Sequence, residues 1–516
     1  MRYLTYSGNN ILSVDLPEGS NVLYPKPPIR GIPLSAYGEH VKRCFENPLG
    51  MPPLKELVDS KSRVLIAFDD NCQPFPLQAQ PDFRQLAIEA LLPMLYSYGV
   101  QKKNLRLICA IALHRKMKEH ELRHMLGDAI MAEFYPHQLD NFDAEDKARM
   151  TSLGKTEAGE EVEISSYAVE ADLIIYVDSV QIPLNGGHKS VGVGLAGYKT
   201  IAYHHHPEMT RECPHVMQPD GSRMHESVER ISRLISGHTK IMVIEFAMNN
   251  AIYPWYNEFL GKAPSASNPL DKLLQSATPA SMKLLPETAR RKVMRSVPGA
   301  YRPTAINAGS IDAVHPHTLT ALRDQLMIDV PRQYDTLVFG LPDLSPYAVD
   351  ARVNPVLVLS DVLGYVFNWF YNKPLIRRGG TVIIMNPVDE VFHPEYHAAY
   401  MRFYDEVLPS TTDPFEMRKR FQDLFAYDPY LIDCYRNKYA HHGFHPFTVW
   451  YWATYPLKYL KNVIIVGPED DKACKRLGVQ WAADINVALE MARGDNGRDD
   501  VAALTLPPFF YINVKG

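Results

Sequence analysis

The residues best suited to covalent and metal chemistry lie in one glycine-rich stretch. Residues 186–190 read Gly-Gly-His-Lys-Ser, and residues 204–206 are three consecutive histidines. A lysine amine in such a loop can bond to an electrophilic carbon when it is desolvated, and the alternative for Lys189 is a surface lysine. Neutral imidazole binds nickel, copper and zinc. Because adjacent side chains point in different directions, at most two of these histidines could meet one metal, and a solvated turn is the alternative.

Two further polar clusters carry groups for acid–base or hydroxyl chemistry. Asp69, Asp70 and Asn71 follow one apolar run, and His114 follows another. Imidazole titrates near neutrality, so His114 is a candidate general base, with a histidine at a helix start as the alternative. Asp69 and Asp70 could bind ligand hydroxyls, or they could cap a helix.

Residues 192–197 match the pattern Gly-x-Gly-x-x-Gly. The dinucleotide-binding form of this pattern begins directly after a strand and opens a helix. Here about fourteen residues separate it from the nearest predicted strand. A tight, closely packed loop is therefore favoured over a nicotinamide site.

Three apolar runs predict the strands that position these clusters, at residues 63–68, 105–112 and 173–177. Between the first two runs, residues 81–99 predict a helix. Strand, helix and strand in this order imply parallel pairing. Ligands in open α/β sheets bind at the carboxyl ends of the strands. We therefore expect the three polar clusters to converge at one edge of a sheet.

The second half of the chain repeats the α/β alternation. Apolar runs at 335–340, 381–385, 463–466 and 509–514 predict strands, and residues 261–281, rich in Ser, Ala and Pro, predict a linker or a long insertion. The predicted fold class is α/β, with two α/β domains of mostly parallel sheets that face a cleft. Residues 1–275 are expected to form the N-terminal cofactor-binding and catalytic domain, and residues 276–516 a C-terminal domain that closes the cleft.

Composition and charge exclude several classes of protein. The chain has 516 residues and a net charge of −5, so no global basic field indicates nucleic acid or an anionic membrane. No apolar run approaches the roughly 18 residues of a membrane span. The six cysteines form no Cys-x-x-Cys pair, and the N-terminus lacks the apolar core of a signal peptide. We expect a cytoplasmic protein.

Taken together, these segments resemble the nickel-pincer nucleotide-dependent lactate racemase family. The Gly-Gly-His-Lys-Ser segment resembles the family's Gly-Gly-Arg-Lys-Ser, and Leu113-His114-Arg115 resembles its Phe/Leu-His-Arg. Further matching segments are found at residues 47–50, 70–76, 168–174, 198–201 and 224–227. The last part of the chain agrees more loosely, through residues 379–383 and the closing strand.

The resemblance implies a racemase or epimerase of a 2-hydroxy acid. It implies a nickel-pincer nucleotide (pyridinium-3,5-bisthiocarboxylic acid mononucleotide with nickel), which cofactor-biosynthesis enzymes supply. Lys189 matches the lysine that tethers this cofactor, His205 matches its nickel ligand, and His114 matches the base that removes the substrate's hydroxyl proton. The residues expected to bind the cofactor are Asp69, Asp70, Asn71, Gly186, Gly187, His188, Lys189 and Ser190.

The chain also departs from the family pattern. Gln73 stands where the family has the arginine that binds the substrate carboxylate. Pro183 stands nearest to the position of the family's second acid/base histidine. The candidates to replace this histidine are His188, His204 and His206. The tyrosine and lysine of the family's second domain have no clear counterpart, and Val353 and Leu357 lie in their approximate register. We therefore expect a substrate other than lactate, larger or richer in hydroxyls, that Gln73 and Asp69 bind, unless another arginine supplies the missing charge. A catalytically altered cofactor-binding homologue and a nicotinamide-dependent oxidoreductase are the alternatives.

Overall fold

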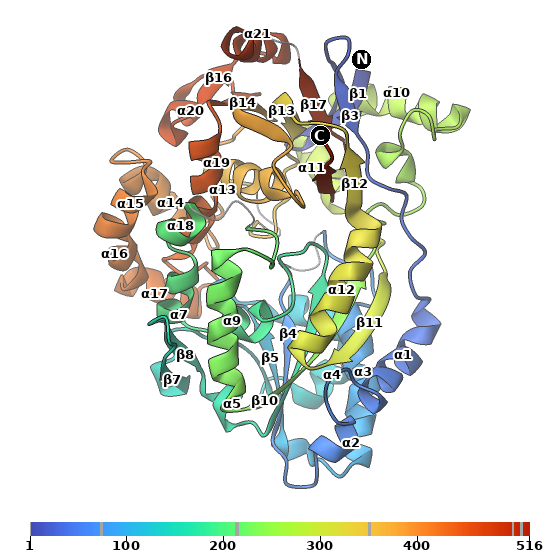
Figure 1. Cartoon of the computed structure of the whole chain (residues 1–516), viewed down its shortest axis with the longest axis vertical. Coiled ribbons are helices and arrows are strands. Elements are labelled where there is room, and N and C mark those ends of the chain that lie inside the picture. Colours follow the sequence, from blue (N-terminus) through green and yellow to red (C-terminus); the bar gives the residue numbers. More distant parts are fainter. Residues whose placement is uncertain (1, 73–75, 212–215, 349–351, 498–499, 506–508) are drawn as a thin grey trace.

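The protein is built around two six-stranded sheets, one above the other in the orientation of Figure 1. The structure is a computed structural model that describes the chain except for residues 1, 73–75, 212–215, 349–351, 498–499 and 506–508. Both sheets are mostly parallel, and helices pack against them, so the predicted α/β fold class is confirmed.

The lower sheet carries the three strands predicted around the polar clusters. In spatial order its strands are β11 (Pro303–Gly309), β10 (Lys240–Met248), β9 (Leu173–Val180), β4 (Val64–Asp69), β5 (Leu105–Ala110) and β6 (Leu139–Asn141). Only the β10–β11 pair is antiparallel; β4 pairs in parallel with both β5 and β9. All residues of β4 and β9 are buried, which explains the apolar runs at residues 64–68 and 173–177.

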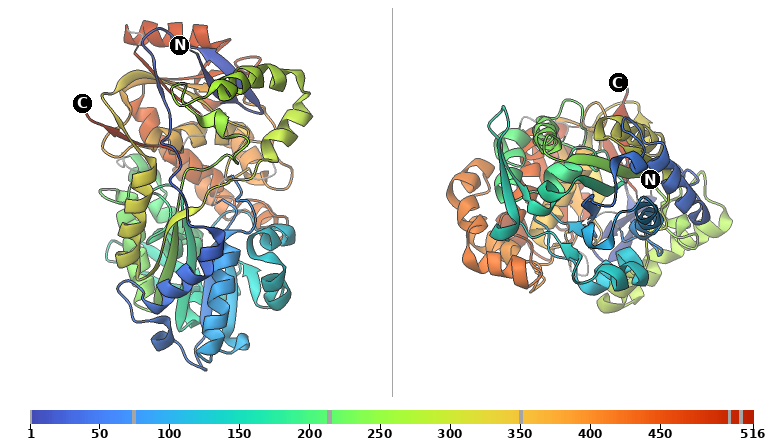
Figure 2. Two further views of the ribbon diagram at one scale, coloured as in Figure 1. Left: turned by 90° about the vertical axis from the view of Figure 1, so that its right-hand side faces the viewer. Right: turned by 90° about the horizontal axis from the view of Figure 1, so that it is seen from below.

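Helices cover both faces of this sheet. The predicted helix is α3 (Phe83–Ser97), and Asp82 caps its start by accepting a hydrogen bond from the backbone N–H of Arg84. On this side α1 (Tyr37–Glu46) packs on α3, and α4 (Glu119–Phe134) packs on α3 as well. On the other side lies α12 (Ile311–Leu326), which packs on β10 and β11; the yellow and blue helices of Figure 2 mark the two sides.

The upper sheet is parallel throughout. Its order is β16 (Gln480–Ala482), β15 (Asn462–Val466), β14 (Ile376–Met385), β13 (Tyr334–Gly340), β17 (Val501–Leu504) and β3 (Asn21–Leu23). Three of the expected strands are therefore present here. The fourth, β18 (Tyr511–Val514), pairs instead with β12 (Met327–Val330) in a separate two-stranded sheet.

The chain passes between the two sheets more than once. Near its start, the hairpin of β1 (Arg2–Ser7) and β2 (Asn10–Asp15) lies beside the upper sheet, and β3 then pairs with β17. The chain next descends to the lower sheet, as Figures 1 and 2 both show. β11 lies beyond residue 275 but belongs to the lower sheet. The two sheets therefore do not correspond to residues 1–275 and 276–516, and the division into these two domains stays a prediction.

Residues 261–281, predicted as a linker or a long insertion, are mostly helical, so the linker alternative was wrong. Most of this segment belongs to α10 (Pro269–Leu284), which packs against β2. Asn268 and Asp271 form a reciprocal cap at its start, and Pro269 occupies the first turn, where no N–H is needed. The good helix formers Leu, Lys and Gln behind such a cap favour a helix, although the Ser and Pro content indicated a loop.

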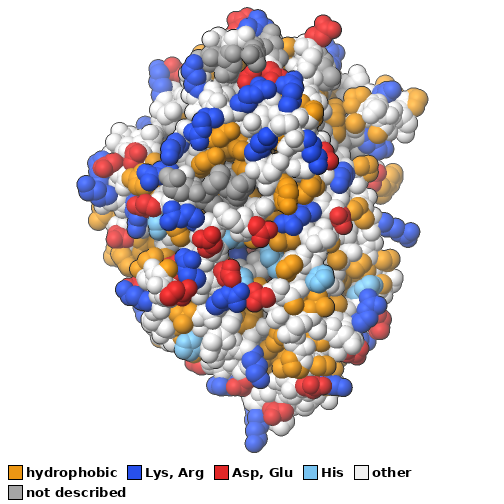
Figure 3. Space-filling model, in the orientation of Figure 1, with side chains coloured by type: hydrophobic (Ala, Val, Ile, Leu, Met, Phe, Trp, Pro, Cys, Tyr) orange, Lys and Arg blue, Asp and Glu red, His pale blue; other side chains and the backbone are white. Residues whose placement is uncertain are grey.

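The face shown in Figure 3 carries interspersed positive and negative side chains, without a broad basic patch. This mixture agrees with the small net charge of the whole chain. Among the described residues, no helix is both long enough and apolar enough to cross a membrane.

Candidate active site

A cavity of about 400 Å³ lies between the two sheets and is lined from both sides. The lower sheet contributes residues at or just after the carboxyl ends of its strands, as predicted. These are Asp69, Asp70, His114, Asp178, Gly186, Lys189, Ser190 and His205. The upper part of the chain contributes Tyr347, Asp361, Tyr365, His445, Thr448 and Trp452. An apolar arm continues toward the β1–β2 hairpin and α10, lined by Tyr6, Ile11, Leu260, Met282 and Met294.

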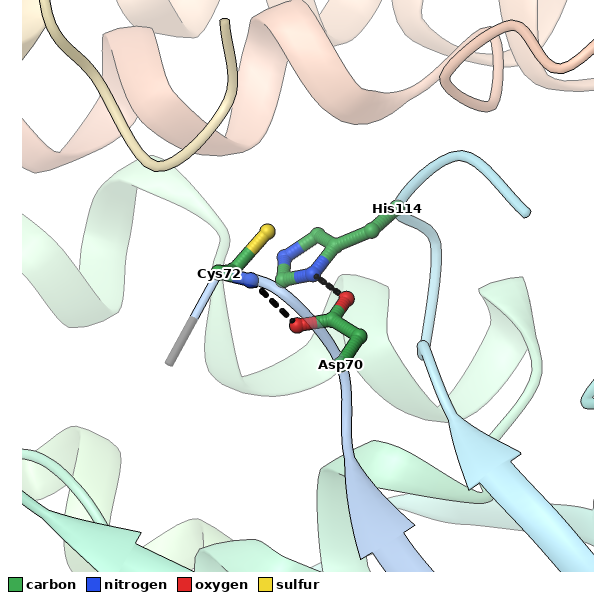
Figure 4. Close-up of side chains that lie close together, drawn as sticks. All are labelled: Asp70, Cys72 and His114. Atoms are coloured by element: carbon green, nitrogen blue, oxygen red, sulfur yellow. Dashed lines mark hydrogen bonds and ion pairs between the residues drawn. The ribbon is translucent and has the colours of Figure 1, made fainter. Parts of the chain in front are cut away.

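Asp70 and His114 form the hydrogen-bonded pair at the centre of the lower wall. Asp70 Oδ2 lies 2.8 Å from Nδ1 of His114, and Asp70 Oδ1 accepts a hydrogen bond of 2.8 Å from the backbone N–H of Cys72. Figure 4 shows the three residues above the ends of β4 and β5. Burial would raise the pKa of the Asp70 carboxyl, but His114 and the hydrogen bonds outweigh it and lower that pKa. Asp70 therefore stays ionised and holds Nδ1 of the imidazole.

A second pair of carboxyls, Asp69 and Asp178, lies deeper in the same wall. Asp69 Oδ2 accepts a hydrogen bond of 2.9 Å from the backbone N–H of Ser179, and the Ser190 hydroxyl donates to Asp178. Burial, followed by the charge of Asp69, raises the pKa of Asp178 well above its ordinary range. The pair therefore favours a bound proton more strongly than exposed carboxyls do.

The Gly186–Gly187 turn is held tightly against the wall. Both glycines have positive φ, of 79° and 62°. A Cβ on Gly186 would lie 2.7 Å from Glu245 Oε1, and a Cβ on Gly187 would lie 2.7 Å from the ring of His315. The Gly187 N–H donates to Glu245 Oε1 at 2.7 Å. Only glycine fits both positions, and this turn places Lys189 at the start of α6 (Lys189–Gly194).

Lys189 points a poorly solvated amine at the cavity. Among the described residues it has no hydrogen-bond or ion-pair partner within 4.0 Å. Burial lowers the pKa of the Lys189 ammonium, although Asp178, Asp69 and Asp70 act in the opposite direction. A larger share of neutral amine makes this lysine a better nucleophile than a solvated one.

Of the three consecutive histidines, only His205 lines the cavity. Its Nδ1 lies 3.3 Å from the carbonyl oxygen of Ile201, which leaves Nε2 with a free lone pair when Nδ1 carries the proton. Burial lowers the pKa of His205 to about 3, so the ring is neutral. It stacks on Trp452, with ring centroids 5.5 Å apart. His204 is fully buried behind it, and His206 pairs with Glu208.

The structure does not bring every expected cofactor-binding residue to the cavity. His188 contacts Ser232 and Asp312, the Asn71 amide faces Glu121, and Gly187 acts through its backbone behind the wall. Gln73 lies outside the described residues. Val353 and Leu357 are buried and do not line the cavity.

Sequence reasoning missed the upper wall, which is made of aromatic and imidazole rings. The ring of His114 lies 5.1 Å from that of His445 and 5.3 Å from that of Tyr347. Tyr347 and Tyr365 share a short hydroxyl–hydroxyl contact, and Tyr365 packs on Trp452 at 4.9 Å. Residues 386–460 are rich in Tyr, Phe and His, which was a signal for part of this wall. This composition did not indicate which of these residues face the cavity.

Two further groups of residues, the Asp70–Cys72–His114 cluster and the Gly-x-Gly-x-x-Gly segment, are explained by contacts within the protein. Asp70, Cys72 and His114 offer three metal-ligating atoms within 4.8 Å of one another. However, the carboxylate and imidazole already bond to each other, and the thiol of Cys72 donates to the Pro346 carbonyl at 3.1 Å. In the Gly-x-Gly-x-x-Gly segment, a Cβ on Gly194 would lie 2.4 Å from the Tyr176 hydroxyl, so its glycines permit packing.

Comparison with known proteins finds a known domain in the first part of the chain. Residues 7–215, which include both Lys189 and His205, match the lactate racemase N-terminal domain. This part of the chain is therefore similar to the lactate racemases. Two curated relatives are the lactate racemases of Thermoanaerobacterium thermosaccharolyticum and Lactiplantibacillus plantarum, which are 26% and 28% identical over 221 and 198 residues. These matches cover 39% and 37% of this chain but only 48% and 43% of the relatives, so the chain spans about half of their length.

Solved structures of this fold extend the likeness over the whole chain. The lactate racemase apoprotein of T. thermosaccharolyticum superimposes with a TM-score of 0.63 at 16% identity, covering both chains completely. A Thermotoga maritima protein superimposes with a TM-score of 0.55 at 12% identity, covering 95% of this chain and all of the other. At these identities the likeness establishes the fold alone.

Proposed function

We propose that this protein is a racemase- or epimerase-type isomerase of a 2-hydroxy acid, acting with a lysine-tethered nickel-pincer nucleotide. The observation that carries the proposal is that Lys189, His205 and His114 line one cavity, although His114 and His205 are 91 positions apart in the sequence. Such a cavity brings a nucleophilic amine, a neutral imidazole and an imidazole bonded to Asp70 to one ligand.

The described residues fit the proposed cofactor. Lys189 offers an amine without a partner for the covalent tether, and the Gly186–Gly187 turn lets backbone approach a bulky group. His205 offers a neutral Nε2 to nickel, a metal that imidazole suits. When bound, the cofactor supplies a centre that accepts a hydride from a substrate carbon and returns it.

His114 is the residue that we propose moves the hydroxyl proton. Because Asp70 holds Nδ1–H, the free lone pair is on Nε2, which can accept the proton of a substrate hydroxyl as hydride leaves the carbon. Asp70 stabilises the imidazolium that forms. His445, which bonds through Nδ1 to the Tyr400 hydroxyl at 2.7 Å, is the third cavity imidazole beside His114 and His205 and can carry a proton from another side.

The charges of the described cavity lining disfavour lactate as the substrate. A bidentate arginine contributes roughly 1.5–3 kcal/mol to carboxylate binding. None of the described cavity residues is an arginine, and Lys189 is the only lysine among them. A substrate carboxylate must therefore be held by neutral donors, which favours substrates that make additional contacts.

The test of the tether and metal is intact mass and metal analysis. The protein is co-expressed with the cofactor-biosynthesis enzymes. We propose that these enzymes are its partners and that it acts in the cytoplasm. The parent should gain a nucleotide-sized adduct and nickel; Lys189→Ala should lose the adduct, and His205→Ala mainly the metal. Lys199→Ala, which removes a half-exposed lysine on the next helix, is the matched control. An unmodified parent, in cells that load a genuine lactate racemase, would refute the proposal.

A label experiment separates the isomerase from its alternatives. A 2-hydroxy acid deuterated at C2 should keep its label while its configuration scrambles. Reduced nicotinamide released on substrate addition would indicate an oxidoreductase instead. A loaded protein that turns over no hydroxy acid would be a catalytically altered cofactor-binding homologue.

A further inference from the structure

Asp361 is the one acidic group of the described cavity lining whose carboxyl oxygens make no hydrogen bond within 3.5 Å. Its side chain lines the cavity, and the residue is only 6% exposed. The three other cavity carboxyls are all engaged, at Asp69, Asp70 and Asp178. Burying a polar group without a close partner is unfavourable, so a cavity-facing one requires an explanation.

The backbone around Asp361 is also unusual. It begins a single π-helical turn (η5, Asp361–Tyr365) that directly follows α13 (Pro355–Ser360). Such turns are rare and are frequent at functional sites. Tyr365, at the end of the turn, also lines the cavity and contacts the Tyr347 hydroxyl. The turn thus presents a carboxyl and a phenol to the same space.

The surroundings of Asp361 favour a neutral, hydroxyl-bearing ligand. Burial raises the pKa of its carboxyl to about 7, and the nearby Ser345 hydroxyl moderates the rise. Near neutrality the group can therefore accept a hydrogen bond from a hydroxyl or donate one to it. The described cavity lining holds four aspartates and one lysine, so a second anionic group on the ligand would be disfavoured by electrostatic repulsion.

We propose that Asp361 binds a substrate hydroxyl, so that the substrate is a 2-hydroxy acid carrying further hydroxyl groups. This inference rests on the proposed isomerase function and adds the substrate class to it. The ribose of a tethered nucleotide offers the same chemistry, but Asp361 belongs to the upper wall, whereas Lys189 belongs to the lower one. The substrate is therefore the partner that we assign.

The test compares two acids of equal chain length, threonate (2,3,4-trihydroxybutanoate) and 2-hydroxybutanoate. Their binding to the cofactor-free and the cofactor-loaded protein is measured by calorimetry. The parent should bind threonate at least tenfold more tightly, and Asp361→Leu should abolish this preference. Asp405→Leu is the matched control, because Asp405 lies on another π-helical turn (η7, Phe403–Val407) with a mostly exposed side chain outside the cavity. Thermal unfolding and circular dichroism establish that each variant is folded, and Asp361→Ala serves if Asp361→Leu does not fold.

The outcomes separate this inference from the proposed function. Equal binding of the two acids by parent and variant, or no threonate binding to either form, overturns the hydroxyl assignment even if the protein isomerises simple hydroxy acids. A threonate preference that depends on Asp361 supports the assignment even if no isomerisation occurs, in which case the proposed function fails alone. Loss of the nucleotide adduct in Asp361→Leu, with threonate binding unchanged, would assign the carboxyl to the ribose and overturn the substrate proposal.

Discussion

Asp70 Oδ2 and His114 Nδ1 lie 2.8 Å apart and join the ends of two neighbouring parallel strands, β4 and β5. The contact fixes the imidazole at one nitrogen and turns the other toward the cavity. It is long-range in sequence, yet it follows directly from the register of the sheet. The same register brings Asp178, at the end of β9, into the wall beside them.

Replacing the members of this pair should reduce turnover to different degrees. His114→Ala removes the proposed base and should lower kcat for hydroxy-acid isomerisation about 10²- to 10⁴-fold. Asp70→Asn keeps the shape but weakens the hold on Nδ1–H, so its loss should be smaller. Chiral chromatography of the product measures both, and intact mass verifies that the cofactor is still loaded. An Asp70→Asn variant with unchanged kcat and pH profile would contradict a positioning role for the carboxylate.

Gly187→Ala should disturb the tether loop without touching the lysine itself. The new methyl group would meet the His315 ring at a positive φ, which costs at least roughly 1–3 kcal/mol of strain. We expect a lower melting temperature and less nucleotide adduct than in the parent. Gly154→Ala, at a positive φ with open space around its Cβ, controls for backbone strain alone. Equal adduct yield in both variants would show that the loop tolerates the contact.

Asp361→Asn should stabilise the protein in a pH-dependent way. In the folded state the carboxyl keeps its proton up to about pH 7, whereas its ordinary pKa is 3.8. Between these values the folded state binds more protons than the unfolded one, so this group makes stability fall as pH rises, and its effect is constant above about pH 8. The gain of the variant over the parent should grow by roughly 2–3 kcal/mol from pH 5 to pH 8. Melting temperatures across this range give the comparison, and a gain that is the same at every pH would refute the buried-carboxyl interpretation.

Cys72→Ser should leave the nickel content unchanged. The thiol lies near Asp70 and His114, but it donates a hydrogen bond to the Pro346 carbonyl, and burial raises its pKa well above the ordinary value, which disfavours the thiolate that binds metals. His205→Ala should lose nickel under the same loading conditions. Metal analysis of the two variants distinguishes the sites, and nickel loss in Cys72→Ser alone would move the metal to the Asp70–Cys72–His114 cluster.

The lower wall of the site could be predicted because it depends on local rules. Runs of buried apolar residues indicated β4, β5 and β9, and parallel pairing then placed Asp70, His114 and Lys189 at one sheet edge. The glycine turn was expected to allow close approach. The structure gives the reason in Glu245 and His315, which come from distant parts of the chain and crowd both Cβ positions.

The upper wall could not be predicted because it depends on the packing of two sheets. Tyr347 lies in an irregular segment after β13, and His445 begins a buried helix, α18 (His445–Trp452), without alternating polarity. Nothing local marks either residue as facing Lys189. Asp361 was equally hidden, because an isolated aspartate at a helix end usually indicates a solvated surface. It is buried because α13 and the π-helical turn η5 pack against α18.

The pairing of β3 with β17 sets a constraint on how the protein is made. About 480 residues separate the two strands, so β17 is synthesised long after β3. At roughly 5–20 residues per second, β3 waits about 25–100 s for its partner. The upper sheet therefore closes only after β17 has been made, whereas the lower sheet, finished at β11, can form earlier. In the interval the nascent chain presents β3 without its partner strand, a state that chaperones can shield.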